Sequence, residues 1–378
     1  MDLGKFVRES AVLDWLDVFL AFREVTTAYE GKVYMIPLDG DVLSFFYRRD
    51  ILEHFNLKVP RTWDEYAEVA KAVHGKTYNG TTLSGSCVGR VEGCVGSYWA
   101  NLVHSSYTQS GGTKTGHMFN PQDMSPLSGE ALAETIRQLE MQNQFGVEEE
   151  FEGCCCGEEG INIKHFLDGS CAMTYNWGDN YKIHFSEDSK VGGLVGVAQT
   201  PGSTRVLDRE TGKLVDCDEE RCRYGERYED IGWVNRAPYA AFAGGWAAAV
   251  AENAPPVQQR LAADFFAYAS SFERSSIGIT PNATGPLSSF NGQDPFRTSH
   301  FELSKWLEKG YPEEGTINYR DTVAKSLNSE NLVVDIRFPE SDTIMGILDK
   351  KIHAYLQRVN RNEIADNDKA SLSPVFNP

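Results

Sequence analysis

Two aspartates separated by one glycine, Asp39-Gly40-Asp41, have the clearest chemical potential in this sequence. On an extended strand, side chains two residues apart project from the same face, about 6 to 7 Å from each other. That spacing is close to the carboxylate separation of about 6.5 to 9.5 Å in inverting glycosidases. A glycosidase needs its carboxylates on opposite sides of the scissile bond, whereas neighbours on one strand end approach a ligand from one side. The pair is therefore a weak candidate for catalysis, and ligand binding or a simple polar turn at Gly40 is favoured.

Four of the seven tryptophans lie among polar residues where they could contact a ligand: Trp99, Trp177, Trp233 and Trp246. An indole face stacks on the C–H face of a sugar ring, while the sugar hydroxyls need polar partners such as Asp, Asn and Arg. A tryptophan taken alone is more often a core residue. Trp177 and Trp246 depart most from that rule, because each follows a strand-like run or a glycine pair beside polar groups. Three others lie on helix faces and are expected in the core: Trp15, Trp63 and Trp306.

Length and charge limit the classes of function. A chain of 378 residues is long enough for two cores, and no segment approaches the 18 or so consecutive apolar residues of a membrane span. The formal net charge of −18 repels phosphate backbones, so no nucleic-acid partner is expected. The motifs GxSxG, GxGxxG and GxxxxGK[ST] are absent in a suitable context, and the eight histidines are scattered. No cofactor and no metal site are therefore expected.

The eight cysteines favour an oxidising compartment, and hence an extracellular or periplasmic location, over a zinc site. They stand at positions 87, 94, 154, 155, 156, 171, 217 and 222. Cys87 with Cys94, and Cys217 with Cys222, could each close a small surface loop by a disulfide. Cys171 is a candidate partner for one of the three consecutive cysteines.

Residues 1–25 predict an amphipathic helix. Its charged residues interrupt any signal-peptide core, so no secretion signal is visible. A cysteine pattern that favours oxidation on such a chain suggests that the natural precursor begins upstream of Met1.

The elements that must position the candidate residues alternate in type. A strand before Asp39 is followed by a strand and then a helix, and Thr62 with Glu65 forms a capping-box pattern for a helix that Gly75 ends. A strand over 171–177 leads Trp177 and Asp179 into a loop. Short strands that are each followed by a helix predict an α/β fold with covered parallel sheets. Because no single linker is visible, two lobes would be interleaved in sequence.

Four segments resemble, in the same order, motifs of the type 1 extracellular solute-binding proteins, the sugar-binding subunits of ABC importers related to maltose-binding protein. The first is "YEGKVYMIPLDGDVLSFFYRRDILEHFNLKVPRTWDEYAEVAKAV", which is similar to the family's G-K-x-Y-x-x-P strand followed by P-x-T-W-D-E. The others are "FLDGSCAMTYNW", "AGGWAAAVAENAPPVQQRLAADFFAYASS" and "PFRTS", which are similar to F-x-x-G-x-x-A-M-x-x-x-W, a G-G-W strand with its helix, and P-x-R. The resemblance covers about residues 29 to 358.

The resemblance implies a periplasmic-binding-protein-like fold of type II, in which two α/β lobes joined by several crossovers close on a solute. Residues 1–100 and 247–300 would form the first lobe, and residues 101–246 and 301–360 the second. Residues 361–378 would be a disordered tail. The family's opening strand-helix-strand unit has no counterpart here, so the first lobe is expected to lack it.

The resemblance also implies a set of ligand-binding residues. Asp39 and Asp41 fall where the first lobe lines the cleft, Trp177 where the second supplies an aromatic platform, and Gly245 with Trp246 where the chain recrosses. Arg297, in the P-x-R element, is a weaker carry-over. The remaining members of the set match by position: Tyr47, Trp99 and Asp179.

Non-catalytic binding of a carbohydrate, a mono- or oligosaccharide, is the function that the resemblance implies, with an ABC permease as the partner. The cysteine-bearing loops leave a second hypothesis open, in which the chain is the ligand-sensing ectodomain of a membrane receptor coupled to a kinase or cyclase. A glycoside hydrolase is the third hypothesis.

Overall fold

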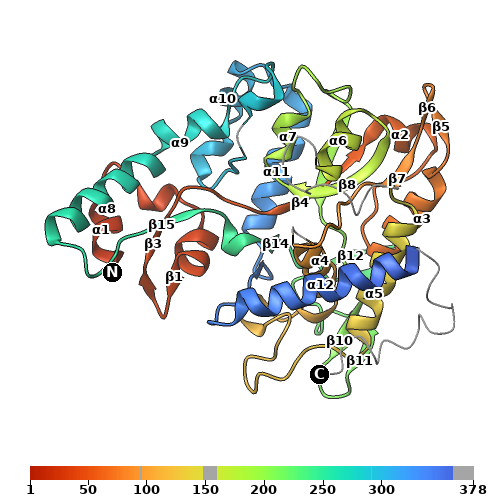
Figure 1. Ribbon diagram of the computed structural model, residues 1–378, viewed down its shortest axis with the longest axis horizontal. Helices are drawn as coiled ribbons and strands as arrows, with labels where there is room; N and C mark the ends of the chain where they lie inside the picture. The colour runs from red at the N-terminus through yellow and green to blue at the C-terminus, as the bar shows by residue number, and fades with distance from the viewer. Residues whose placement is uncertain (94–95, 148–159, 291, 361–378) are drawn as a thin grey trace. The chain divides into compact units, whose positions relative to one another are not determined.

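The computed structural model describes residues 1–93, 96–147, 160–290 and 292–360 (Figure 1). Its contacts divide the chain into unit 1, made of Met1–Ser44, Asn176–Gln199 and Pro238–Asp335, and unit 2, made of Phe45–Tyr175, Thr200–Ala237 and Ile336–Pro378. The mixture of helices and strands and the interleaving of two parts agree with the sequence-based prediction. The chain passes between units after residues 44, 175, 199, 237 and 335, whereas the predicted boundaries were at residues 100, 246 and 300.

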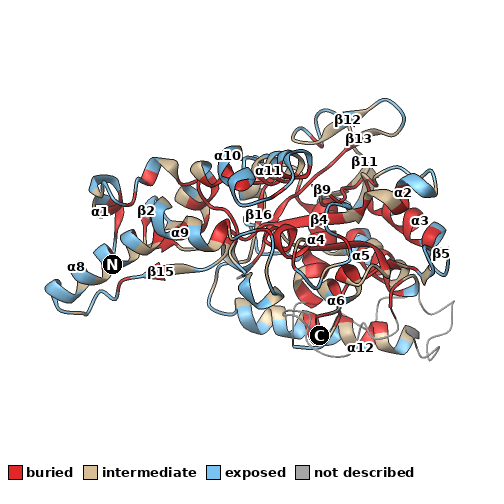
Figure 2. Ribbon diagram, turned by 90° about the horizontal axis from the view of Figure 1, so that it is seen from above, coloured by how far each residue is buried: buried red, intermediate tan, exposed pale blue. Residues whose placement is uncertain are grey.

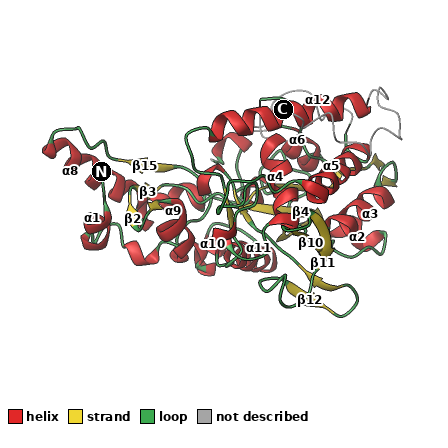
Figure 3. Cartoon of the chain, turned by 90° about the horizontal axis from the view of Figure 1, so that it is seen from below, coloured by secondary structure: helices red, strands yellow, loops and turns green. Residues whose placement is uncertain are grey.

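Unit 1 is built on short strands that pair two by two. The pairs are β1 (Ala28–Tyr29) with β2 (Lys32–Val33), β3 (Met35–Pro37) with β15 (Ala247–Ala249), and β14 (Tyr239–Ala240) with β16 (Val333–Val334). The first two pairs are antiparallel and the third is parallel. One further strand of this unit is β9 (Val195–Gln199). Figure 3 shows how short the strands are beside the helices.

The helical elements of unit 1 are α1 (Gly4–Glu9), η1 (Trp15–Asp17), η2 (Ala21–Thr26), α7 (Asn180–Ile183), η4 (Phe242–Gly244), α8 (Pro256–Ser270), α9 (Phe272–Ile279), η5 (Leu287–Ser289), η6 (Thr298–Phe301), α10 (Leu303–Glu308) and α11 (Glu313–Leu327). An aromatic core joins α7 to α11, because the rings of Tyr181 and Tyr319 stack with centroids 4.4 Å apart. Trp306 and Tyr311 pack on the same pair.

The single helix predicted over residues 1–25 is wrong. The structure contains three short segments there, α1, η1 and η2, and Asp14 between the first two has a left-handed backbone with φ of 45°. The carbonyls of Leu13 and Asp14 accept hydrogen bonds from the side chain of Arg297, at 2.6 and 3.2 Å. Carbonyls used in this way do not continue an α-helical ladder, so a tertiary contact overrides the local amphipathic pattern.

Unit 2 contains a sheet in which β7 (Ser84–Ser86), β8 (Cys171–Trp177) and β4 (Leu43–Arg48) are neighbours in that order, with β7 and β8 parallel. Three hairpins accompany it: β5 (Thr77–Tyr78) with β6 (Thr81–Thr82), β10 (Arg205–Asp208) with β11 (Lys213–Asp216), and β12 (Glu226–Tyr228) with β13 (Gly232–Val234). The helical elements are α2 (Arg49–His54), α3 (Trp63–Val73), α4 (Gly96–Thr108), η3 (Thr113–Thr115), α5 (Gly129–Gln144), α6 (Ile161–Leu167) and α12 (Ser341–Asn360). The strand-then-helix reading of 41–55 and the helices predicted around 62–74, 97–107 and 128–145 are confirmed.

The core of unit 2 is aromatic. Trp63, Tyr66 and Trp99 each pack a ring against Tyr175, with centroids between 5.4 and 6.2 Å apart. In Figure 2 the buried colour covers much of α4 and β4, whereas long stretches of α8 and α12 are exposed. Among the described residues, no helix is long and apolar enough to cross a membrane.

One of the two hydrogen bonds of the predicted capping box of α3 is present. Thr62 Oγ1 accepts a hydrogen bond from the backbone N–H of Glu65 at 3.2 Å. The Glu65 carboxylate, however, accepts from Arg61, whose backbone N–H lies 2.7 Å away, rather than from the Thr62 backbone that a capping box would use. At the other end Gly75 has φ of 74°, which suits a residue that ends a helix.

We expect Thr62→Ala to lower the free energy of unfolding by about 1 kcal/mol, because the N–H of Glu65 loses its acceptor. Urea denaturation followed by tryptophan fluorescence measures the change. Thr62→Ser keeps the hydroxyl and is the matched control, with a smaller expected loss. Equal losses in the two variants would mean that the methyl group, not the cap, stabilises this end of α3.

The disulfides differ in part from the predicted pairs. Cys217 and Cys222 are bonded as predicted. Cys87 is bonded to Cys171, so its predicted pairing with Cys94 is wrong, and so is the pairing of Cys171 with one of the consecutive cysteines. The parallel register of β7 and β8 pairs Ser84 with Cys171, and Cys87 follows the end of β7 with its Cα 6.1 Å from that of Cys171. Cys94 and the three consecutive cysteines, as well as residues 361–378, lie outside the described residues.

Candidate functional site

Asp39 and Asp41 lie in the loop of unit 1 between β3 and β4, and both are buried. One carboxylate oxygen of Asp39 accepts hydrogen bonds from the backbone N–H of Gly40 at 2.8 Å and from that of Asp294 at 2.6 Å. The backbone N–H of Leu38 donates to the carbonyl of Trp246 at 2.9 Å. The pair is thus held between two distant segments of the chain.

Glycines allow this close backbone packing. Gly245 has φ of 99°, and a Cβ added to it would lie 2.9 Å from the nitrogen of Asp41 and 3.1 Å from the carbonyl oxygen of Asp39. A Cβ on Gly178 would lie 2.6 Å from a carboxylate oxygen of Asp294. Larger residues do not fit at these distances, so the glycines let three loops meet around the aspartates.

Four buried carboxyl groups meet there, and we call them the carboxyl cluster: Asp39, Asp41, Asp179 and Asp294. Burial raises the pKa of Asp39 to about 6, with a smaller contribution from the charge of Asp179. Burial and then the charges of Asp39 and Asp179 raise the pKa of Asp41 well above its usual range. The pKa of Asp294 is raised in the same way by burial and by its acidic neighbours. The cluster therefore holds protons at a pH where exposed aspartates have lost them.

Lys182 is the cation whose charge acts on Asp39, Asp179 and Asp294. Its side chain is buried, and burial lowers its pKa. The Nζ atom donates a hydrogen bond to the carbonyl of Gln293 at 2.5 Å. One lysine thus acts on three of the four carboxyl groups.

Two aromatic residues, Trp177 and Phe242, stand close in sequence to Asp179 and Gly245. Trp177 lies two residues before Asp179, and its ring packs on Phe242 with centroids 5.7 Å apart. Phe242 has φ of 52°, an unusual backbone for a bulky residue, and its side chain is 42% exposed. Trp246, which follows Gly245, is 73% exposed. Exposed rings beside buried carboxyl groups suit a ligand with one apolar and one polar face.

Within the part of the chain that the structure describes, no group of three or more His, Cys, Asp or Glu side chains could hold a metal ion. The carboxyl cluster therefore offers a ligand hydrogen-bond acceptors and charge.

Residues 2–285 match the sequence model of the bacterial extracellular solute-binding proteins. The chain belongs to this family. The match includes both ends of the loop that bears Asp39 and Asp41, and also Trp177, Lys182 and Gly245.

Individual relatives are distant. The lactose-binding protein of Rhizobium radiobacter is 34% identical over 74 residues, which are 18% of this chain and 18% of that protein, so the match spans less than a fifth of the relative. The ABC transporter solute-binding protein from Agrobacterium radiobacter K84, solved in complex with ribitol, matches with a TM-score of 0.68 at 18% identity, over 100% of this chain and 80% of that one. Maltose-bound MalE3 of T. maritima matches with a TM-score of 0.63 at 17% identity, over 98% of this chain and 78% of that one. These structures show that this solute-binding protein has the two-lobed periplasmic-binding-protein fold.

Two of the residues predicted to bind ligand belong to unit 2. Trp99 is fully buried on α4, where its indole N–H donates to the carbonyl of Gly89 at 3.0 Å, so it presents no surface to a solute and serves the core. Tyr47 is half-buried on β4 and stacks on Phe45 with centroids 5.6 Å apart. Neither residue belongs to unit 1, the unit that contains the carboxyl cluster.

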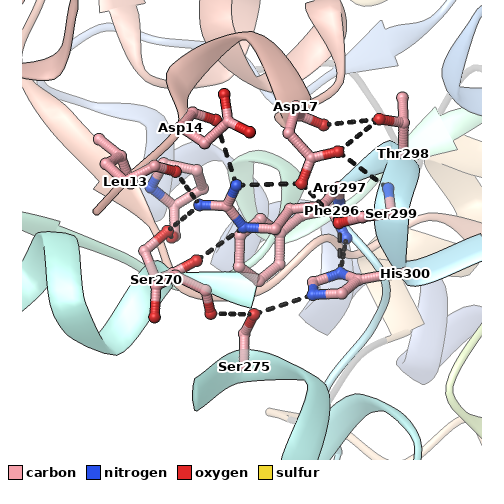
Figure 4. Close-up of polar contacts among 12 residues, drawn as sticks. Leu13, Asp14, Asp17, Ser270, Ser275, Phe296, Arg297, Thr298, Ser299 and His300 are labelled. Carbon is pink, nitrogen blue, oxygen red and sulfur yellow. Dashed lines mark hydrogen bonds and ion pairs between the residues drawn. The ribbon is translucent and has the colours of Figure 1, made fainter. Parts of the chain in front are cut away.

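Arg297 lies in unit 1, but its side chain donates its hydrogen bonds to other groups of the protein (Figure 4). It is fully buried and donates to the carbonyls of Leu13, Asp14 and Ser270 and to the carboxylate of Asp17. That pattern is a structural anchor, and it argues against the predicted ligand contact.

Four residues of the site were missed in the sequence: Lys182, Phe242, Asp294 and Tyr319. Asp294 follows "NGQ" and precedes Pro295, a pattern that indicates a loop without indicating its neighbour. Lys182 stands three residues after the predicted Asp179 and was the easiest of the four to include. The glycines at 40, 178 and 245 were a usable signal, since each stands beside a predicted site residue where another backbone approaches.

Proposed function

We propose that this solute-binding protein binds a carbohydrate or polyol on the outer side of the cytoplasmic membrane, and delivers it unchanged to an ABC-type permease. The observation that supports this most is the carboxyl cluster beside the Trp177 and Phe242 rings, all within unit 1. The family supports solute binding in general. The ribitol, maltose and lactose named for its relatives support a polyhydroxylated solute.

The chemistry of the two halves of the site matches such a solute. Sugar and polyol hydroxyls donate hydrogen bonds, and the oxygens of Asp39, Asp41 and Asp179 accept them. A bond to a buried carboxylate is stronger than one between neutral groups. Exposed indole and phenyl faces such as Trp246 and Phe242 suit the apolar C–H face of the same molecule.

Binding without turnover is part of the proposal. A glycosidase places its acid and its base on opposite sides of the bond that breaks. Here the acidic groups gather in a single cluster within unit 1, where burial and, to a lesser extent, the charge of Asp179 raise the pKa of Asp39, Asp41 and Asp294. Such an arrangement accepts hydrogen bonds and does not flank a scissile bond.

Titration calorimetry across a panel of mono- and disaccharides and pentitols tests the proposal. We expect saturable binding for at least one solute, and a loss of affinity of about tenfold or more in Asp41→Asn, since one charge-assisted hydrogen bond contributes about 1.5 to 3 kcal/mol. Trp177→Ala should lower the affinity for the same solute by a similar factor. Glu252→Gln removes an exposed carboxylate of unit 1 and is the control. Folded protein that gives no heat with any solute, or that releases monosaccharide from a disaccharide, would contradict the proposal.

A further inference from the structure

The carboxyl cluster contains more acidic groups than hydrogen bonding to neutral hydroxyls requires. Asp294 is fully buried, and its carboxyl oxygens accept no hydrogen bond from a backbone N–H or a cation within the described residues. Its hydrogen-bonding neighbour is another acidic group, the carboxyl of Asp41. Buried carboxyl groups are normally paired with a cation or neutralised, because an isolated buried charge is costly.

The other basic groups of unit 1 near this cluster do not supply the missing positive charge. Arg297 is bonded to Asp17 and to main-chain carbonyls. Burial lowers the pKa of His300 to about 3 and that of His184 to about 3, so both rings are neutral at physiological pH. Lys182 remains, and its charge acts on Asp39, Asp179 and Asp294.

A second polar group points to a ligand rather than to the cluster alone. The hydroxyl of Tyr319 is fully buried and has no hydrogen-bond partner within the described residues. It lies close enough to Asp294 and Asp179 for their charges, after burial, to raise its pKa further. An unsatisfied buried hydroxyl costs about 1 to 3 kcal/mol, so a group that could bond to it would be stabilised there.

We propose that the carboxyl cluster takes a solute with a protonated amine, namely an amino sugar or an aminopolyol. This inference rests on the proposed function and narrows its solute class. An ammonium group has three N–H donors and a full positive charge, which match Asp41, Asp179 and Asp294 better than hydroxyls do. The Tyr319 hydroxyl can accept a hydrogen bond from the same group or donate one to a neighbouring hydroxyl of the solute.

Proton release accompanies such binding. Without ligand, protons held by the cluster offset part of its charge, and an incoming ammonium favours the ionised carboxylates. Since the pKa of Asp39 is raised to about 6, affinity should rise with pH between about 5 and 7 as this carboxyl ionises. Above the pKa of the solute's amine, affinity should fall again. The charged or titratable groups that act on Asp39 and Asp41 are Asp179, Lys182, Asp294 and Asp335.

Matched pairs of solutes test the inference in the intact chain. Calorimetry at pH 7 compares D-glucosamine with D-glucose, D-galactosamine with D-galactose, and N-methyl-D-glucamine with D-sorbitol. We expect the amine of at least one pair to bind about tenfold or more tightly than its neutral partner, the usual gain for one charge-assisted contact. N-acetylation, which removes the charge, should abolish the preference. Repeating the titration in two buffers of different ionisation enthalpy should reveal protons released on binding.

Two variants test whether the preference for the amine arises from the carboxyl cluster. Asp294→Asn and Asp179→Asn should each reduce the preference for the amine by about tenfold, and both should flatten the pH dependence between 5 and 7. Glu252→Gln, an exposed carboxylate in the same unit, should leave preference and pH profile unchanged. If one aspartate variant fails to fold, the other carries the test.

The outcomes separate the inference from the proposed function. Tighter or equal binding of the neutral member in every pair overturns the inference and leaves solute binding intact. Binding of neither member of any pair overturns the inference as stated and counts against the proposed function as well. Amine preference that persists in both aspartate variants overturns the assignment to the carboxyl cluster.

Discussion

Arg297→Met should lower the free energy of unfolding by about 3 to 5 kcal/mol, the usual range when one partner of a buried ion pair is removed. The Arg297 side chain is fully buried, and it donates to the carbonyls of Leu13 at 2.6 Å and Ser270 at 2.7 Å and to the Asp17 carboxylate at 3.2 Å. Methionine fills a similar volume but has no donors, so the carbonyls of Leu13 and Ser270 would lose their side-chain donor. Asp17 would lose its cation and keep the hydrogen bonds from Thr298 and Ser299. Urea denaturation monitored by circular dichroism measures the loss.

The same variant distinguishes a structural role from a ligand contact. Arg260→Met is the matched control, because Arg260 lies in unit 1 with a side chain 70% exposed and pairs with Asp264 at the surface. Its expected loss is about 1 kcal/mol or less. At a temperature where Arg297→Met is still folded, its solute affinity should equal that of the wild type. A stable variant that has lost solute binding would restore Arg297 to the ligand site.

Local patterns in the sequence predicted the elements around the site well. The strand before Asp39, the strand that ends at Trp177 and the helix that begins after Thr62 are all present, because each depends on neighbours within a few residues. The prediction of a single helix over residues 1–25 was wrong for the opposite reason, because the structure there depends on a distant contact. There the carbonyls of Leu13 and Asp14 bind a side chain more than 280 residues away.

The candidate site was predicted in part for the same reason. Asp39, Asp41 and Asp179 follow strand-like runs, and polar residues at strand ends are typical of ligand sites in α/β folds. Asp294, whose backbone N–H donates to Asp39, stands 255 residues further along the chain in a loop with no periodicity. Which loops meet depends on the packing of unit 1 as a whole, and no local pattern encodes it.

Trp99 and Arg297 were predicted to bind ligand because of their residue types, and the structure does not support that role. Both are residue types that bind ligands often, and both are equally suited to satisfying a buried network. Trp99 donates its N–H to a main-chain carbonyl inside the core of unit 2, and Arg297 donates to several in unit 1. Burial decides between the two roles, and burial of one particular side chain follows from the tertiary structure.

The two disulfides among the described residues of unit 2 should stabilise it unequally. Cys87 and Cys171 are 84 residues apart in sequence, whereas Cys217 and Cys222 are 5 apart. In the chain-entropy description, a bond that closes a longer loop removes more freedom from the unfolded chain. We expect the loss of the first bond, in Cys87→Ser with Cys171→Ser, to cost about 4 to 5 kcal/mol, and loss of the second, in Cys217→Ser with Cys222→Ser, about 2 kcal/mol.

Urea denaturation of both double variants under oxidising conditions, with free thiols blocked, measures the difference. Because the tryptophan core of unit 2 includes Trp63 and Trp99, fluorescence follows this unit in both cases. Under full reduction the wild type loses both of these bonds, so its stability should fall below that of either oxidised variant. The long bond also links Cys87, which directly follows β7, to β8, the parallel neighbour of β7, so its removal should loosen the pairing of these two strands as well. Equal losses in the two variants would show that strain or structure in the unfolded chain outweighs loop length, and that the order of the cysteines along the sequence does not set the stability of this unit.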